Sequence, residues 1–293
     1  IFFRESTMTD LQEIQHVANE KWDGINQACA RAGLSKAGFM GLWGESLQTD
    51  GSFTMGVKVE ENVWRNARFP DGLRTHVNGC TTMGQILAYA AEKFGEHPCM
   101  GWRDITAVHV EGEKKFEKFT LSDYKWMSYI EVKKAVDEFG AGLAALGMTH
   151  GQNISIYADT SKEWQMTAQA CFARGFPVAT VYASLGGEAL QYGLEQTEVT
   201  HVITDAALVP AIAAIIDKLP LLTHIIFTSD PRPAGEGGHK KDEQVAALIK
   251  KPGVKVMSWK SVQELGESTP IAPFEEPTPE DIAVIMYTSG STG

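Results

Sequence analysis

The sequence predicts an α/β protein in which parallel sheets, built from repeated βαβ units, are covered by helices. From residue 153 onward, short apolar runs bounded by turn residues alternate with stretches of helical periodicity. These runs are rich in valine and isoleucine and do not alternate with polar residues, which is typical of strands buried on both faces. The connections between them are long enough to hold the crossover helices that parallel neighbours require.

The chain divides near residue 78 into two parts of different regularity. Residues 1–78 contain scattered glycines and three tryptophans but no pattern that indicates chemistry, so we interpret them as a poorly defined N-terminal extension. Residues 79–293 hold the regular periodicity and form the predicted domain. The chain starts at Ile1 and stops at Gly293 directly after an apolar run and a glycine loop. We therefore expect the domain to be truncated and the fold to be incomplete at the C-terminus.

Two helices and a hairpin are predicted ahead of the first parallel strand. Thr82 and Gln85 form a T-x-x-Q capping box in front of an amphipathic helix. Residues 106–110 and 118–121 are rich in β-formers and flank a polar turn that contains glycine, which predicts a hairpin. Apolar residues at helical spacing across 132–146 predict a second helix that faces the core.

The repeating region predicts six strands with helices between them. Thr160 and Glu163 form a T-x-x-E capping box for the first of these helices, residues 186–187 open the next, and 206–219 form a third. The strands are expected at residues 153–157, 177–181, 200–204, 224–228, 254–257 and 282–287. Ligands bind outside the carboxyl ends of such strands, which directs attention to the turn after the last one.

Composition excludes several classes of function. The 293 residues carry 26 basic and 37 acidic side chains, a net charge of −11 that argues against nucleic acid as a partner. The four cysteines are widely spaced and indicate neither a zinc site nor a disulfide framework. No apolar run approaches the roughly 20 residues of a transmembrane helix, so any membrane association of the chain is expected to be peripheral.

The segment after the last predicted strand is the most informative in the chain. Residues 282–287 are apolar, and the six residues that follow are only threonine, serine and glycine. Glycines let the backbone approach an anion closely, and small hydroxyls add donors without bulk. The spacing is not that of a Walker A loop, and a flexible linker is the alternative interpretation. We predict phosphate binding, because linkers do not usually emerge from a buried strand.

A family resemblance supports this interpretation. Residues 287–293, Y-T-S-G-S-T-G, resemble the opening of the signature loop of the adenylate-forming (AMP-binding) superfamily, whose motif continues into x-Pro-Lys-Gly. Residues 181–188 and 195–204 are similar to long-chain fatty acyl-CoA synthetases, particularly the eukaryotic type. The resemblance covers about residues 60–293 and implies the N-terminal portion of the adenylate-forming enzyme fold.

The resemblance also implies a reaction and its cofactors. A long-chain fatty acid carboxylate attacks the α-phosphate of ATP with Mg²⁺ present, and the thiol of coenzyme A then displaces AMP from the acyl-adenylate. The residues implied to hold the β- and γ-phosphates are Thr288, Ser289, Gly290, Ser291, Thr292 and Gly293. The family's catalytic and magnesium-binding groups would lie beyond Gly293, so we expect no catalytic or metal-binding residue here and no turnover by this piece alone.

Two other functions remain open at this point. One is an adenylate-forming ligase for a different carboxylic acid, and the other is a truncated product that acts as a non-catalytic binding or regulatory partner. Family members commonly work in the cytoplasm, at the cytosolic face of membranes such as the endoplasmic reticulum, and we expect the same here. Among single residues, Trp164 is predicted to pack in the core, Glu188 to lie at a helix N-terminus, and His201 to be a packing or surface residue.

Overall fold

The structure is a computed structural model that describes residues 75–111, 116–233, 241–270 and 273–287, together with the backbone of four short strands nearer the N-terminus. Contacts divide the chain into two units, Ile1–Thr75 and His76–Gly293. In the first unit, β1 (Ser46–Leu47) pairs antiparallel with β2 (Phe53–Thr54), and β3 (Gly56–Glu60) pairs antiparallel with β4 (Val63–Asn66).

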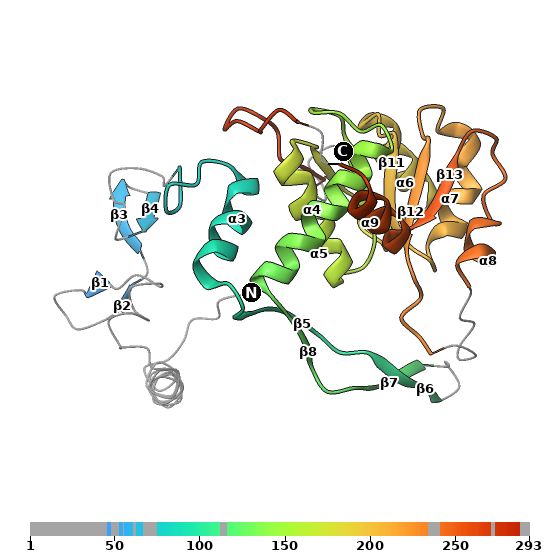
Figure 1. The fold of residues 1–293 in the computed structure, drawn as a ribbon, viewed down its shortest axis with the longest axis horizontal. Coiled ribbons are helices and arrows are strands. Elements are labelled where there is room, and N and C mark those ends of the chain that lie inside the picture. The colour runs from blue at the N-terminus through green and yellow to red at the C-terminus, as the bar shows by residue number, and fades with distance from the viewer. Residues whose placement is uncertain are drawn as a thin grey trace. The chain divides into compact units, whose positions relative to one another are not determined.

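A six-stranded parallel sheet organises the second unit (Figure 1). The strand order is β13-β12-β11-β9-β10-β14, and every neighbouring pair is parallel. The bounds are β9 Ile154–Tyr157, β10 Val178–Thr180, β11 His201–Asp205, β12 His224–Thr228, β13 Lys255–Ser258 and β14 Val284–Met286. The predicted parallel α/β fold is therefore confirmed. No strand extends more than one residue beyond the range predicted for it.

Helices cover the two faces of the sheet, and alternate residues of the strands serve two separate cores. On one face lie α3 (Met83–Phe94), α4 (Tyr129–Ala145), α5 (Lys162–Arg174) and α9 (Trp259–Ser268), which contact one another. On the other lie α6 (Gly187–Gln196), α7 (Val209–Ile215) with the 3₁₀ turn η1 (Ile216–Lys218), and α8 (Asp242–Ala246). Ile154 and Ile156 of β9 join the first core, whereas Tyr157 joins the second, as the two-residue period of a strand requires.

Two glycines allow α4 and α9 to pack unusually closely. A Cβ atom on Gly142 would lie 2.0 Å from the carbonyl oxygen of Val262, and one on Gly266 would lie 1.8 Å from that of Glu138. No side chain fits at either position, so any larger residue would force these helices apart and disrupt the packing against the sheet.

Helix caps confirm one prediction and correct another. The side-chain oxygen of Gln85 accepts hydrogen bonds from the backbone of Thr81 and Thr82, as the box before α3 predicts. The box at Thr160 and Glu163 was wrong, because α5 begins one residue later. Ser161 caps this helix, and its hydroxyl accepts from the backbone NH of Trp164 at 3.1 Å. Thr160 and Ser161 are both competent caps, and the sequence pattern could not choose between them.

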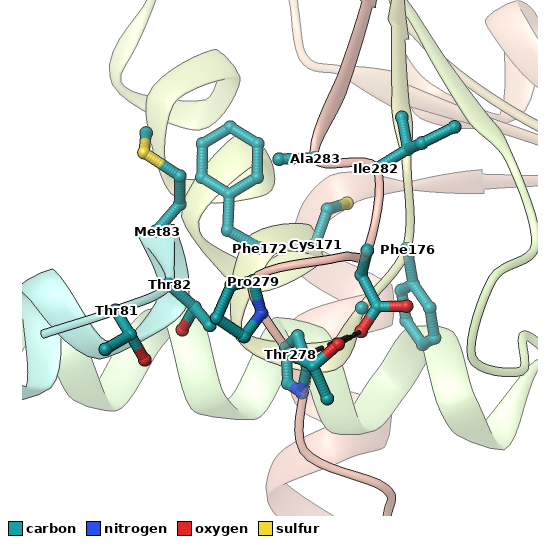
Figure 2. A pocket seen from close by; sticks show the side chains of 13 residues that line it. Thr81, Thr82, Met83, Cys171, Phe172, Phe176, Thr278, Pro279, Ile282 and Ala283 are labelled. Carbon is teal, nitrogen blue, oxygen red and sulfur yellow. Dashed lines mark hydrogen bonds between the residues drawn. The ribbon is translucent and has the colours of Figure 1, made fainter. Parts of the chain in front are cut away.

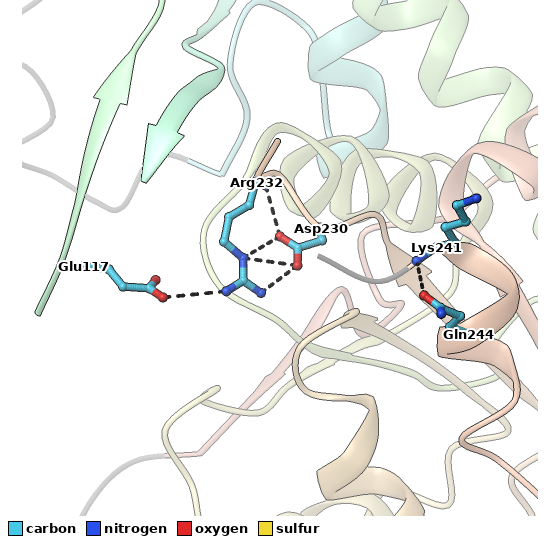
Figure 3. A network of polar contacts seen from close by, with 5 residues as sticks. All are labelled: Glu117, Asp230, Arg232, Lys241 and Gln244. Atoms are coloured by element: carbon cyan, nitrogen blue, oxygen red, sulfur yellow. Dashed lines mark hydrogen bonds and ion pairs between the residues drawn. The ribbon is translucent and has the colours of Figure 1, made fainter. Parts of the chain in front are cut away.

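A long two-stranded arm projects from the helical layer (Figure 1). The predicted hairpin is β6 (Ile105–Glu111) paired with β7 (Phe116–Leu121), and it continues into the pair β5 (Pro98–Trp102) and β8 (Lys125–Ser128). At the far end of the arm, Glu117 lies 3.8 Å from the guanidinium of Arg232, which also binds Asp230 after β12 (Figure 3). This ion-pair network connects the arm to the loop that follows β12.

The predicted helix at 206–219 is divided between α7 and η1. Within the part of the chain that the structure describes, no helix has both the length and the apolarity needed to cross a bilayer.

Candidate functional site

The carboxyl edge of the sheet is where its topology places a ligand. The chain runs from β9 to β10 on one side and then crosses to β11 on the other, so the strand order reverses at β9. Ligands of open α/β sheets bind in the crevice outside such a reversal. Polar or hydroxyl-bearing residues end or follow the strands at this edge: Tyr157, Thr180, Asp205, Thr228 and Tyr287.

The six residues predicted to bind phosphate, Thr288–Gly293 in sequence, lie outside the described residues. The strand before them is described. β14 pairs with β10 in the register Val178↔Val284 to Thr180↔Met286, and Tyr287 follows directly at the carboxyl edge. The chain therefore enters the predicted loop from this edge of the sheet, two strands away from β9, where the strand order reverses.

The expectation that this last strand is buried on both faces was wrong. β14 is only three residues long and is the outermost strand, and Val284 and Met286 keep 37% and 65% of their surface exposed. Ile285 between them packs against the core that contains α6 and α7. One face of β14 is thus covered by the described chain and the other is not. A continuous apolar run does not tell whether a strand lies at the centre or at the edge of a sheet.

Tyr287 fixes the point at which the chain leaves the sheet. Its hydroxyl donates to the side-chain oxygen of Gln196 at 2.8 Å and lies 3.4 Å from the carbonyl oxygen of Gly193, both on α6. The tyrosine ring lies against the helix at Gly193, where a Cβ atom would be at ordinary contact distance, 3.7 Å, from the ring. Burial raises the pKa of the Tyr287 hydroxyl, which therefore acts as a hydrogen-bond donor at neutral pH.

Asp205 joins three strands at the same edge. One oxygen of its carboxylate accepts from the backbone NH of Asp159 after β9 at 2.7 Å, and the other accepts from the hydroxyl of Thr228 on β12 at 2.8 Å. Burial raises the pKa of Asp205, against the effect of these two hydrogen bonds and with the help of the nearby negative charges of Asp159 and Glu163. Asp205 and Asp159 thus lie close together on this side of the edge, and Glu163 there pairs with Lys162.

The turn between β10 and α6 lies between these two anchors. The hydroxyl of Tyr157 on β9 donates to the carbonyl oxygen of Ala183 at 3.3 Å, and the backbone NH of Leu185 donates to the carbonyl oxygen of Tyr182. α6 begins after Gly186, and Glu188 lies in its first turn as predicted. Tyr182 projects into solvent, so the turn presents an exposed aromatic ring beside the edge.

A cavity of about 160 Å³ lies at the opposite, amino end of β14 (Figure 2). Its walls include Thr82, Phe172 and Ile282, and Asp281 accepts from the backbone NH of Thr278 at 2.7 Å at its rim. Because Ala283 precedes the strand whereas the predicted loop follows it, this cavity is not the predicted phosphate site. Trp164 packs against the core and His201 is buried in β11, both in agreement with the sequence-based interpretation.

Sequence reasoning missed Asp205, Tyr157 and Thr228 as members of this edge. Their common signal is a polar or hydroxyl-bearing residue at the last position of an apolar strand, which parallel pairing brings to one edge. Asp205 was missed because the strand was ended one residue too early. Among the described residues there is no group of three or more histidine, cysteine, aspartate or glutamate side chains placed to hold a metal ion.

Comparisons with known proteins agree with this geometry. Residues 96–293 match the family described as AMP-binding enzyme. Long-chain-fatty-acid–CoA ligase 1 of Schizosaccharomyces pombe is 30% identical over 250 residues, which cover 80% of this chain and 35% of that protein. Long chain acyl-CoA synthetase 8 of Arabidopsis thaliana is 33% identical over 237 residues, covering 80% and 32%. The chain spans about a third of the length of these relatives.

Solved structures show the same fold. The adenylation domain of the carboxylate reductase from Mycobacterium chelonae aligns with a TM-score of 0.58 at 19% identity, over 75% of this chain and 34% of that one. The A domain of the carboxylic acid reductase from Segniliparus rugosus, in complex with AMP and a co-purified carboxylic acid, gives 0.56 at 14% identity, over 71% and 33%.

Proposed function

The chain belongs to the AMP-binding enzyme family, and from this premise we propose that its complete gene product activates long-chain fatty acids to acyl-CoA through an acyl-adenylate. The observation that carries the substrate class is the identity of 30% and 33% to a long-chain-fatty-acid–CoA ligase and a long chain acyl-CoA synthetase. In the first step a carboxylate oxygen bonds to the α-phosphorus of ATP and pyrophosphate leaves. In the second the thiol sulfur of coenzyme A bonds to the acyl carbon and AMP leaves.

The two halves of the carboxyl edge differ in charge, and this difference supports a phosphate site near β10 and β14. Asp159 and Asp205 place two carboxylates on the side near β9 and β11, where Glu163 pairs with Lys162, and these two charges disfavour triphosphate on that side. The side near β10 and β14 lacks these two charges, and it is there that Tyr287 directs the chain into residues 288–293. We assign the backbone amides and hydroxyls of these six residues to the β- and γ-phosphates.

Magnesium, when bound with ATP, would neutralise part of the charge that builds up on the phosphates. The described residues offer it no cluster of three ligands, so we assign it to the phosphates and to no described residue. The contribution of the described residues is positional. Tyr287 holds the start of the loop against α6, and Asp205 holds the ends of β9, β11 and β12 in register.

The reaction is tested by pyrophosphate exchange into ATP with the complete gene product and a panel of acids. Palmitate and oleate are expected to support exchange, and acetate, benzoate and amino acids to support little. Exchange driven best by benzoate or by an amino acid would replace the fatty acid with another substrate class and leave the adenylation chemistry intact. Absence of exchange with every acid, while ATP still binds, would favour a non-catalytic binding role.

The phosphate assignment is tested separately by nucleotide binding to the 293-residue chain. Replacing both Ser289 and Thr292 with alanine removes two hydroxyl donors and is expected to weaken ATP binding by about tenfold. Thr106→Ala, on the exposed arm, is the matched control and should bind ATP as the unchanged chain does. Equal affinity of the double variant and the control would remove the loop hydroxyls from the proposed site.

A further inference from the structure

The described structure contains a second cavity, of about 320 Å³, that the proposed reaction does not use. It lies between the C-terminal half of α4, the end of α5 and the described residues 269–270 and 273–275 after α9, and its walls include Ala141, Ala144, Met148, Arg174 and Phe274. Met148 and Arg174 come just before β9 and β10, so the cavity is at the amino edge of the sheet. The carboxyl edge, with the predicted phosphate loop, is on the opposite side.

Arg174 is the unusual group in this cavity. Only 7% of its surface is exposed, and among the described residues no hydrogen bond or ion pair reaches its guanidinium, whose nitrogen atoms keep contact with the open space of the cavity. Its stem packs against Gly140, where a Cβ atom would lie 3.3 Å from the arginine Cγ, and its guanidinium carbon stacks 4.0 Å from the ring centre of Phe274. The stacking covers a face of the guanidinium and leaves the NH groups along its edge without a protein acceptor.

A buried charge without a partner is costly, and proteins normally pair it. The groups that face Arg174 do not do so. Asp137 on α4, about one turn before Ala141, attracts the Arg174 guanidinium at longer range but forms an ion pair with Lys133. Glu275, on the rim of the cavity, is exposed. No described residue therefore supplies an acceptor for the Arg174 guanidinium, and water or an anion in the cavity can take that position.

The wall nearest this charge is mostly apolar, and the titratable His150 on the same cavity is already paired with Asp281. Ala141, Met148 and Phe176 are buried, and Ala144 is half-buried beside them. This arrangement suits a ligand that has one planar anionic group and a short aliphatic body, because arginine binds carboxylate through two parallel hydrogen bonds. We propose that the cavity is a binding site for a short aliphatic carboxylate, held by Arg174 and separate from the proposed adenylation site.

The test uses the 293-residue chain with ¹³C-labelled methionine methyl groups, and hexanoate as the probe. The Met148 signal is identified as the one that Met148→Leu removes, and it reports on this cavity alone. We expect a saturable shift of this signal with hexanoate, a weaker affinity for acetate, which has no aliphatic body, and no shift with hexanol, which has no charge. A local signal is needed because hexanoate could also enter the proposed fatty acid site.

Two variants separate the proposal from loss of folding. Arg174→Gln removes the positive charge and is expected to weaken hexanoate binding at least about tenfold. Ala144→Leu keeps Arg174 but fills the cavity, and it is expected to weaken hexanoate binding to a similar extent. Arg103→Gln, which removes an exposed arginine on the arm, should leave the affinity for hexanoate unchanged. The proposal would be overturned if the Met148 signal showed no saturable shift, or if hexanol shifted it as hexanoate does. It would also be overturned if acetate bound as tightly as hexanoate, or if either cavity variant bound hexanoate with unchanged affinity. In each case water would be the partner of Arg174.

The site does not depend on the proposed function. Failure of pyrophosphate exchange with fatty acids would leave the Met148 shift in place. Conversely, normal pyrophosphate exchange together with a Met148 signal that does not respond to hexanoate would refute the carboxylate site and leave the proposed enzymatic activity standing.

Discussion

The central strands of the sheet and its last strand have similar apolar sequences and very different surroundings. Ile156 in β9 is 1% exposed and lies between Thr180 of β10 and Ile203 of β11. Ile285 in β14 has a paired neighbour only on the β10 side and is half-buried. Among the described residues, the strand that leads into the predicted functional loop is thus paired on one side, whereas the central strand β9 is paired on both.

The ends of these strands differ in the same way. At the carboxyl edge, the carboxylate of Asp205 connects β11 to the backbone after β9 and to β12 through two hydrogen bonds. β14 ends at a single tyrosine whose hydroxyl reaches α6. The centre of the edge is therefore cross-linked by a side chain, whereas among the described residues Tyr287 alone connects the end of β14 to α6.

The largest expected effect tests the packing difference directly. Ile156→Ala leaves a cavity in a fully buried site and is expected to lower the free energy of unfolding by about 3–4 kcal/mol. Ile285→Ala makes the same chemical change at the edge and is expected to cost only about 1 kcal/mol, because the site is half open to solvent. Urea denaturation followed by far-UV circular dichroism measures both. Equal losses would show that β14 is as firmly packed as β9.

The amino ends of the central strands carry a second distinguishing feature, a pair of buried histidines. The rings of His201 and His224 stack with centroids 4.3 Å apart, and the Nε2 atom of each is buried without a partner. Burial, together with the neighbouring His224, lowers the pKa of His201 to about 4, and burial with Lys255 nearby lowers that of His224. Both rings are neutral in the folded protein near pH 7.

This pair makes stability depend on pH in a defined direction. The unfolded chain takes up protons on these rings below about pH 6.5, whereas folded His201 does so only near pH 4. Stability is therefore complete above pH 6.5 and falls as the pH decreases toward 4, by about 3 kcal/mol for His201. His201→Phe keeps a stacked ring, and urea titrations at several pH values should show a smaller slope. An unchanged slope would place the pH dependence elsewhere.

The same comparison explains what the sequence could and could not predict. The valine- and isoleucine-rich runs predicted the central strands, because a strand buried on both faces needs apolar residues at every position. The run at 282–287 satisfies the same pattern, yet Val284 and Met286 are exposed at an edge. Which strand lies beside which is decided by pairing between distant segments, such as Ala179 with Ile285, and local periodicity carries no information about it.

The candidate site shows the same limit at the level of single residues. Its glycine- and hydroxyl-rich loop was predicted because composition and a family resemblance both mark it. Asp205 was missed, because its role depends on Asp159 and Thr228, which lie 46 and 23 residues away in the chain. The cap of α5 was misplaced by one residue for a smaller reason, since Thr160 and Ser161 are chemically equivalent caps.

Asp205→Asn tests the cross-linked part of the carboxyl edge. The amide keeps the size of the side chain but is neutral and has only one acceptor oxygen, so both donors lose a charged acceptor and one of them loses its acceptor altogether. We expect a loss of about 2 kcal/mol in the free energy of unfolding. Asp217→Asn, at an exposed position on η1, is the matched control and should change stability by less than about 0.5 kcal/mol. A loss no larger than the control's would mean that Asp205 does not hold these strands together.

Tyr287→Phe has the smallest expected effect on stability and the most local consequence. It removes the hydroxyl that reaches Gln196 and keeps the ring against Gly193, so the free energy of unfolding should fall by about 1 kcal/mol. Because this hydroxyl holds the start of the proposed phosphate loop, ATP binding should weaken by about threefold to tenfold. Tyr192→Phe, on an exposed ring of the same helix, should change neither quantity. If ATP binds equally well to both variants, the loop is positioned without Tyr287, and the β14 end of the edge has a further anchor beyond the described residues.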